Sequence, residues 1–208
     1  MIIGNSVTTI GGGAFNGCSS LTSVTIPKSV TTIGGGAFYN CSSLTSVTIP
    51  SSVTRIGASV FSDCSSLMSV TIPNSVTEIS EYAFYNCSGL TKVIIGNSVT
   101  TIGANAFNGC SSLTTLYTNN TIPPNVKYGN FTNEQYMHLT VYVPQVALEA
   151  YQRADEWKSF WNLQANPTGI EKIQAETGKT VYYDLRGSRL PAPKRGLNII
   201  KGKKVITK

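Results

Sequence analysis

Five cysteines are spaced by 23 residues throughout, and the chain has no others. Thiols can form disulfides, bind zinc or act as nucleophiles, and each chemistry needs particular neighbours. Disulfide frameworks favour an even number of cysteines at irregular spacing, and zinc sites favour Cys-x-x-Cys pairs or histidine partners. This chain has an odd number of cysteines, no such pair and a single histidine, His138. We therefore interpret the cysteines as a ladder of free thiols in a repeated core, where cysteine acts as a small hydrophobe: Cys18, Cys41, Cys64, Cys87 and Cys110.

Two glycine runs, Gly11 to Gly13 and Gly34 to Gly36, invite comparison with a phosphate-binding loop. Their spacing is not G-x-G-x-x-G, no Lys-Ser or Lys-Thr pair follows, and no helix of useful length comes next. We find no paired acid and base, no cluster of metal ligands and no cofactor loop. The sequence therefore predicts no catalytic residue, no metal site, no cofactor and no enzymatic activity.

Each cysteine belongs to a repeating phrase, which is clearest over residues 29–50 as SVTTIGGGAFYNCSSLTSVTIP. A fixed period of this length is typical of a stacked array of coils, in which equivalent residues lie over one another. Eight positions are apolar in all or nearly all copies. In this copy they are Val30, Ile33, Ala37, Phe38, Cys41, Leu44, Val47 and Ile49. These columns are the predicted core, and a single coil buries too little to fold alone.

The phrase also predicts the elements of one coil. Residues 44–49 alternate apolar and small polar side chains, which indicates a strand with Val47 inward and Ser46 outward. Residues 30–33 indicate a second short strand, followed by a glycine at position 34 that suggests a turn with unusual dihedral angles. Residues 37–44 fit one or two helical turns, α or 3₁₀.

The phrase Ser-Val-Thr-x-Ile-Gly-x-x-Ala-Phe-x-x-Cys-Ser-Ser-Leu-Thr-x-Val-x-Ile-Pro resembles the BspA-like, or Treponema pallidum-type, leucine-rich repeat of bacterial surface and secreted proteins. Five copies cover residues 1–118. The resemblance implies a leucine-rich-repeat solenoid, mainly β with short helical or 3₁₀ turns, that serves adhesion or protein recognition. We expect five 23-residue coils followed by a strand-helix cap and a small β tail.

Residues 119–165 are predicted to form a terminal repeat and a C-terminal cap. The repeat decays at residues 121–124, residues 139–143 read as one more strand, and a helix is expected over about 145–161. The pairs Val143-Pro144 and Ala150-Tyr151, and the run from Trp157 to Phe160, resemble the segment that closes BspA-like arrays. A solenoid end exposes its core, so we expect Trp157 and Trp161 to cover it.

Residues 166–208 form a basic tail with short β-like stretches, carrying ten basic and three acidic side chains. Its end resembles the C-terminal sorting domains that the type IX secretion machinery of Bacteroidetes recognises, although Asn198 stands where tyrosine is usual. The alternative is a small β module or a loosely attached tail.

Charge and hydropathy narrow the class of partner. Residues 1–118 carry three basic and three acidic side chains on a surface rich in Ser and Thr. A protein that binds nucleic acid concentrates positive charge on its binding surface. We therefore expect no nucleic acid as a partner. No stretch reaches transmembrane length, so we expect no membrane span.

The first residues of the chain lie within a repeat and do not have the pattern of a leader. We therefore expect a piece of a longer cell-surface or secreted protein; a genuine cytoplasmic start is the alternative. The strand edge of the first coil is predicted to promote self-association.

The outward strand positions are the predicted partner-binding surface. Most are Ser or Thr, and the fourth and fifth coils depart from that norm. The candidate residues are Ser69, Thr71, Lys92, Ile94, Thr115 and Tyr117. We expect a host or bacterial extracellular protein, or a glycan, as the partner. The alternative is a structural spacer or stalk that displays another domain.

Overall fold

The computed structural model describes residues 1–166, 182–183, 189–190, 196–200 and 203–207. The chain divides into two compact units, Met1–Ala165 and Asn166–Lys208. The second unit contains an antiparallel sheet in the order β15-β14-β16-β17. Its strands are β14 (Tyr182–Tyr183), β15 (Arg189–Leu190), β16 (Gly196–Ile200) and β17 (Lys203–Thr207). The remaining residues of the predicted sorting segment lie outside the described part of the chain.

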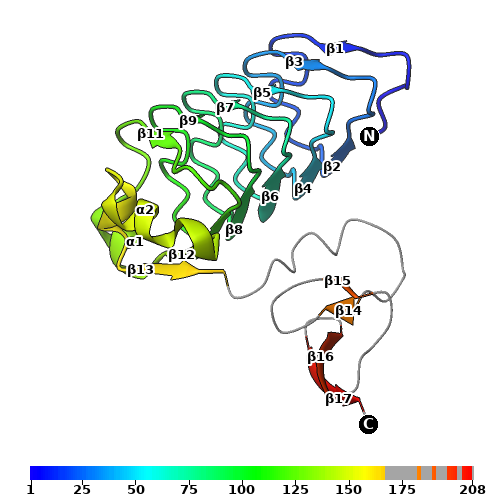
Figure 1. Cartoon of the computed structure of the whole chain (residues 1–208). Helices are drawn as coiled ribbons and strands as arrows, with labels where there is room; N and C mark the ends of the chain where they lie inside the picture. The colour runs from blue at the N-terminus through cyan, green and yellow to red at the C-terminus, as the bar shows by residue number, and fades with distance from the viewer. Residues whose placement is uncertain (167–181, 184–188, 191–195, 201–202, 208) are drawn as a thin grey trace. The chain divides into compact units, whose positions relative to one another are not determined.

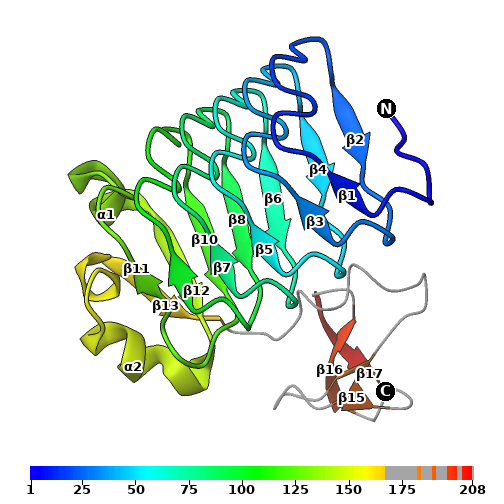
Figure 2. The ribbon, with the colours of Figure 1, turned by 90° about the horizontal axis from the view of Figure 1, so that it is seen from above.

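The first unit is a stack of coils with two rows of parallel strands (Figures 1 and 2). One row holds β2 (Ser23–Thr25), β4 (Ser46–Thr48), β6 (Ser69–Ile72), β8 (Lys92–Ile95) and β10 (Thr115–Thr118). The other holds β1 (Thr9–Ile10), β3 (Thr32–Ile33), β5 (Arg55–Ile56), β7 (Glu78–Ile79), β9 (Thr101–Ile102) and β11 (Asn125–Val126). Paired residues are 23 apart along the regular coils, as Val70 and Val93 illustrate. The repeat period therefore sets the register of both rows.

Both rows of strands are interrupted between the second and third coils. Strands β1 and β3 form one two-stranded sheet and β2 and β4 another, while longer sheets begin at β5 and β6. The coils stay joined through their turns, where the Phe38 amide donates to the Val60 carbonyl oxygen at 2.9 Å. Stacking therefore continues through the interruption.

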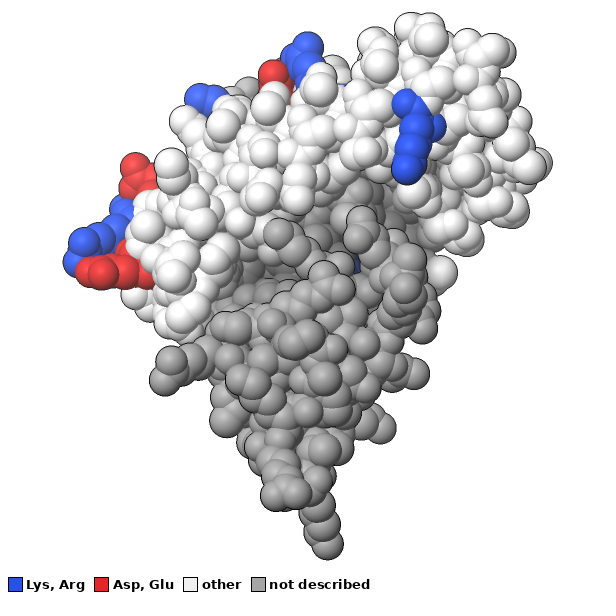
Figure 3. Space-filling view, turned by 45° about the vertical axis from the view of Figure 1, so that its right-hand side comes forward, with Lys and Arg blue, Asp and Glu red and all other residues white. Residues whose placement is uncertain are grey.

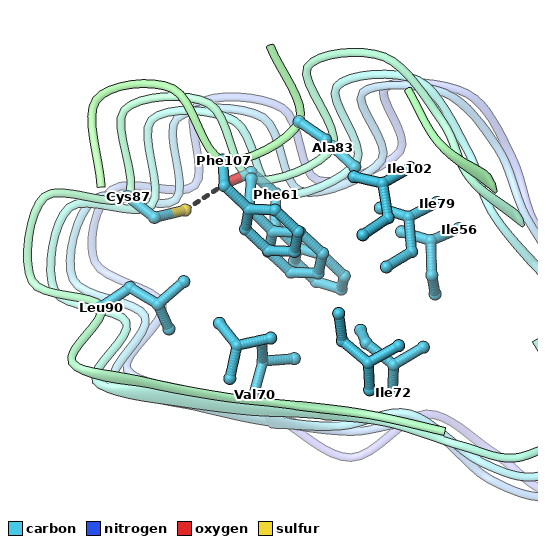
Figure 4. Close-up of a cluster of buried hydrophobic side chains, with 14 of the residues drawn as sticks. Ile56, Phe61, Val70, Ile72, Ile79, Ala83, Cys87, Leu90, Ile102 and Phe107 are labelled. Atoms are coloured by element: carbon cyan, nitrogen blue, oxygen red, sulfur yellow. Dashed lines mark hydrogen bonds between the residues drawn. The ribbon is translucent and has the colours of Figure 1, made fainter. Parts of the chain in front are cut away.

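The core consists of the predicted apolar columns, which lie between the two rows of strands (Figure 4). Its most regular feature is a ladder of phenylalanine rings. Successive pairs from Phe15 to Phe107 stack with centroids 5.1 to 5.5 Å apart and planes within 15° of parallel. Phe131 continues the ladder at 6.3 Å from Phe107. Leucine, valine and isoleucine columns surround the rings, so each coil is buried by its neighbours.

The glycine that follows the short strand has a different role from the expected one. The expectation of unusual dihedral angles is wrong, because Gly34 and Gly103 do not have positive φ. A Cβ atom at Gly34 would instead lie 2.4 Å from the Gly12 nitrogen, and one at Gly103 would lie 2.5 Å from the Glu81 nitrogen. Close approach of neighbouring coils excludes a side chain at these two positions.

The stack continues past the point where the repeat decays. Strand β11 pairs with β9, so residues 121–124 do not end the coil. Helix α1 (Asn133–His138) follows and begins with a capping box. In that box the Thr132 hydroxyl accepts from the Gln135 amide, and the Gln135 side chain accepts from the Thr132 amide. This short helix takes the place of the turn found in the regular coils.

Buried side-chain amides close the hydrogen-bond ladder of the fifth coil. Asn130 Oδ1 accepts from the Phe107 amide at 3.1 Å, and Gln135 Nε2 donates to the Cys110 carbonyl oxygen at 2.9 Å. Asn120 Nδ2 likewise donates to the Val99 carbonyl oxygen. Unpaired buried backbone groups are costly, so these side chains stand in for a further coil. The repeat pattern does not reveal these three side chains, although Thr132-x-x-Gln135 is a recognisable capping signal.

The cap contains three short helical pieces, where one helix over 145–161 was expected. They are the 3₁₀ turn η1 (Gln145–Ala147), helix α2 (Leu148–Arg153) and the 3₁₀ turn η2 (Trp157–Ser159). Ala154 is extended and Glu156 has a φ of 66°, which ends the helix before Trp157. This break lets the chain turn back and add β13 (Asn162–Ala165) beside β12 (Thr140–Val143).

The two cap tryptophans lie in opposite environments. Trp157 is fully buried, its indole N–H donates to the Pro124 carbonyl oxygen at 2.8 Å, and its ring meets Tyr151 edge-on at 5.0 Å. Trp161 is 76% exposed, so the expectation that it also covers the core is wrong. Trp161 lies between the 3₁₀ turn η2, which begins at Trp157, and strand β13, with which the chain rejoins the sheet.

Candidate partner-binding face

The six candidate binding residues lie together on the outward face of three adjacent strands. Ser69, Lys92 and Thr115 are aligned across β6, β8 and β10, and the same pairing aligns a second row. That second row is Thr71, Ile94 and Tyr117. The two residues on β6 are exposed, and the four on β8 and β10 are half-buried. The structure thus places the candidates as a compact grid, and their role stays a prediction.

An aromatic pair extends this grid onto the cap. Strand β12 pairs with β10 so that Tyr142 lies beside Tyr117, and their rings stack with centroids 4.7 Å apart and planes 16° from parallel. Lys92 Nζ lies 4.7 Å from the centroid of the Tyr117 ring, within the range of a cation–π contact. Lys92, Ile94, Tyr117 and Tyr142 together are called the binding face below.

Tyr142 was missed because its separation from Tyr117 is 25 residues and departs from the period. The alternation of residues 140–143 indicated which side chains point outward. Only the pairing of β12 with β10 shows which outward residue Tyr142 meets.

The binding face is suited to recognition more than to chemistry. It offers tyrosine rings, an ammonium group and an isoleucine, which are groups that form contacts with a protein or a sugar. Among the described residues, no group of three or more His, Cys, Asp or Glu side chains is placed to hold a metal ion.

The thiol ladder is a packing feature in four of its five members. Each buried thiol donates to the carbonyl oxygen of a phenylalanine 26 residues earlier, as Cys87 does to Phe61 at 3.1 Å (Figure 4). The four buried thiols are free. Cys18 is exposed, so the expectation of burial is wrong for this member, because no coil of this chain packs against it on that side.

Burial raises the pKa of the inner thiols, since a thiolate loses its hydration in the core. The pKa of Cys41 rises to about 11, and those of Cys64 and Cys110 rise to about 12. Burial also places the pKa of Cys87 well above 9.0. These thiols remain protonated at neutral pH, which makes them poor nucleophiles.

We predict that one thiol per chain reacts quickly with a disulfide reagent such as DTNB. Cys18 is accessible, while the inner thiols react only when the coils open. Absorbance should report one equivalent at once and all five after unfolding in urea. The variant Cys18→Ala should lose the fast phase, and several fast equivalents in the native protein would contradict the buried ladder.

A cleft of about 350 Å³ brings the histidine close to one of the cysteines. It lies beside α1 and is lined in part by Cys110, Glu134, Gln135 and His138. The Cys110 thiol is fully buried and donates to the Phe84 carbonyl oxygen at 3.2 Å. The Cys110 thiol therefore packs in the core and is not activated by His138 as a nucleophile.

The fold and the outward face define the class of protein. Stacked parallel strands, inward leucine, cysteine and phenylalanine columns and a largely polar outer face make this a leucine-rich-repeat solenoid, as the sequence predicted. A model of the family described as "BspA type Leucine rich repeat region" matches residues 1–137 in six copies. The chain therefore belongs to the BspA-type leucine-rich-repeat family.

Solved structures share this fold. A leucine-rich cell-surface protein of Faecalibacterium prausnitzii is 40% identical over 57% of this chain, with a TM-score of 0.56. The chain spans only 31% of the length of that protein. The leucine-rich-repeat protein of T. pallidum is 26% identical, with 76% of this chain and 79% of its own length covered and a TM-score of 0.55.

The pneumococcal vaccine antigen PcpA is 17% identical over 72% of this chain and 37% of its own length, at a TM-score of 0.55, which shows the fold alone. No curated protein sequence matches significantly. In the described part of the chain, no helix is both long and apolar enough to cross a membrane.

Proposed function

We propose that the chain is a non-catalytic binding module of a bacterial cell-surface or secreted protein and that it recognises an extracellular protein through the binding face. The observation that carries the proposal is the aromatic and cationic cluster around Tyr117 and Tyr142, which departs from the Ser and Thr that occupy the same columns in the first three coils. Tyrosine is enriched in the centres of protein interfaces. The F. prausnitzii protein, which shares 40% identity, is a cell-surface protein, and this supports the compartment.

The arrangement of the binding face favours a protein partner. Ile94 lies in register with Tyr117, and both are flanked by polar positions on the same strands. An apolar centre within a polar rim is the usual anatomy of a protein interface. A glycan stays an alternative partner for the same face, because stacked tyrosines also suit sugar rings.

A spacer or stalk is the second candidate function. The observation that favours it is the uniform outward face of the first three coils, where Ser and Thr recur at Ser23, Thr25, Ser46, Thr48, Ser69 and Thr71. In Figure 3 charged side chains are few on the described part of the surface, and most of it is uncharged. Such a surface keeps a solenoid soluble without selecting a partner.

We expect the combined variant Lys92→Ser, Ile94→Thr and Tyr117→Thr to bind at least tenfold more weakly to surfaces coated with mucin or with basement-membrane protein. These replacements restore the residues that occupy the same columns in the third coil, Ser69 and Thr71. The core columns are untouched, so the melting temperature should change by only a few degrees.

The matched control for this experiment is Ser23→Ala with Thr25→Ala, on the same face of the first coil. It should retain full adhesion. Equal adhesion of the triple variant and the unmodified chain would eliminate the binding face as the site. Failure of the unmodified chain to adhere to either surface would favour the spacer.

Three expectations remain predictions. The sorting role of residues 166–208 lies beyond the family match, which ends at residue 137. Placement at the cell surface or in the medium follows from that role and from the family. Self-association through the first coil is consistent with the 87% exposure of Ile2 and can be measured by light scattering.

A further inference from the structure

A second cluster lies away from the binding face, on the turns that lead from each short strand to the next long one. We call residues 35–40, 58–63 and 81–86 the turn edge. It carries three tyrosines, of which Tyr39 and Tyr82 are 38% and 39% exposed. Tyr82 and Tyr85 meet edge-on, with ring centroids 5.6 Å apart and planes at 72°.

A carboxylate belongs to the same turn edge. Asp63 accepts a hydrogen bond from Ser62 Oγ at 3.1 Å and another from Asn86 Nδ2 at 3.0 Å. The pKa of Tyr39 is raised, chiefly because its hydroxyl lies near this negatively charged acceptor. Both side chains that donate hydrogen bonds to the Asp63 carboxylate are neutral, so they hold it in place without cancelling its charge.

The charge balance of the turn edge is negative. Of the three acidic side chains in residues 1–118, Asp63 and Glu81 lie on this edge, while Glu78 pairs with Arg55 at 2.9 Å on the short strands. Within the described residues, no lysine or arginine forms an ion pair with Asp63 or Glu81. A fixed negative charge beside electron-rich rings attracts cations.

A small residue separates two of the tyrosines of the turn edge. Tyr39 and Tyr85 occupy the same position in the second and fourth coils, and the third coil has Ser62 between them, only 2% exposed. Coils are about 4.8 Å apart, so the two tyrosines stand about 10 Å apart across a small residue. The Asp63 carboxylate accepts a hydrogen bond from Ser62 Oγ and therefore lies beside this small residue.

The backbone of Tyr82 indicates that the ring is not there for stability. Tyr82 has a φ of 56° in a column that otherwise holds Gly13, Gly36, Ser59 and Asn105. A bulky residue with positive φ is unfavourable by about 1–2 kcal/mol. Residues kept in such conformations are concentrated at functional sites.

We propose that the turn edge binds a lysine side chain of a basic protein segment, with the ammonium group between Asp63 and the rings of Tyr39, Tyr82 and Tyr85. This surface is distinct from the binding face of the proposed function and stands independently of it. A neutral sugar would use the rings but would gain nothing from the unbalanced charge. A lysine uses both features and its alkyl chain covers the tyrosine rings.

The test is a nuclear magnetic resonance titration of the full chain with the peptide acetyl-Gly-Lys-Gly-Lys-Gly-amide. Amide signals of residues 39, 62–63 and 82–86 should shift in a saturable way, and the affinity should fall when salt is raised. The same peptide with norleucine in place of lysine keeps most of the alkyl chain and lacks the charge. It should bind at least fivefold more weakly.

Asp63→Asn is the sharpest variant, because it removes the charge and keeps the shape. Asparagine already occupies this position in the neighbouring coils, as Asn40 and Asn86 with φ of 54° and 58°. We expect at least a fivefold loss of affinity with an unchanged melting curve. The matched control is Asp155→Asn, an exposed carboxylate that pairs with Lys158 in the cap, and it should bind normally.

Tyr82→Asn separates recognition from packing. If the ring serves binding, this variant should melt at a higher temperature, because it relieves the positive-φ strain, and should bind the lysine peptide more weakly. A lower melting temperature with unchanged affinity would assign Tyr82 to packing and overturn its role. Equal binding of the norleucine peptide, no effect of Asp63→Asn, or shifts produced by maltotriose and not by the lysine peptide would overturn the proposal.

Discussion

Phe84→Ala is expected to lower the free energy of unfolding by about 3–5 kcal/mol, the usual range for a buried phenylalanine truncated to alanine. Phe84 is fully buried and stacks on both sides, 5.4 Å from Phe61 and 5.4 Å from Phe107. Its loss opens a cavity in the middle of the ladder that neighbouring coils cannot fill, because their own hydrogen bonds hold them in register. Urea unfolding followed by circular dichroism measures the change.

Phe15→Ala is the matched control, at the same position of the first coil. Phe15 is half-buried and stacks on one side only, against Phe38 at 5.1 Å. The loss there should be less than half of that for Phe84→Ala. Equal losses at the two positions would show that stability does not depend on how many neighbours a coil has.

Raising the pH from 9 to 10 is expected to remove about 3 kcal/mol of stability through three thiols, Cys64, Cys87 and Cys110. Their pKa values are raised by burial, to about 12 for Cys64 and Cys110, from an ordinary value of 9.0. The folded chain keeps protons that the unfolded chain loses. Their stabilisation is therefore complete below pH 9 and declines as the pH rises toward 12. Each thiol loses about 1 kcal/mol between pH 9 and 10, where the unfolded thiol is still partly protonated, and about 1.4 kcal/mol per pH unit above that.

The slope of unfolding free energy against pH between 9 and 10 measures these protons. Cys87→Ala removes one buried thiol and should reduce the slope by about a quarter to a third. Cys18→Ala removes the exposed thiol and should leave the slope unchanged. An unchanged slope in Cys87→Ala would mean that this thiol ionises equally in the folded and unfolded chains.

The regular coils were predictable because the same residues recur at one interval. Val70 must lie over Val47 and under Val93 if every coil buries the same positions, and the ladder of phenylalanines follows from the same reasoning. The outward direction of Lys92, Ile94 and Tyr117 follows from alternation along a strand. The fold and three of the four residues of the binding face thus needed no tertiary information.

The irregular end of the solenoid was not predictable in this way. The break of the cap helix at Ala154 and Glu156 and the exposure of Trp161 depend on where the chain must turn to reach the sheet again. The buried amides of Asn120, Asn130 and Gln135 acquire their role only because the fifth coil leaves backbone groups that need partners.

By itself, the sequence determined the class of fold, the register of the coils, the core columns and the absence of a disulfide pattern, since all of these repeat at a constant separation. Only the three-dimensional arrangement shows that Tyr142 stacks on Tyr117, that Cys18 is exposed and that Asp63 lies near Tyr39 of the neighbouring coil. The stacking of Tyr142 depends on a residue that departs from the 23-residue period, and the exposure of Cys18 depends on its place in the first coil. The third depends on side-chain directions on the turns, where the residues differ from coil to coil.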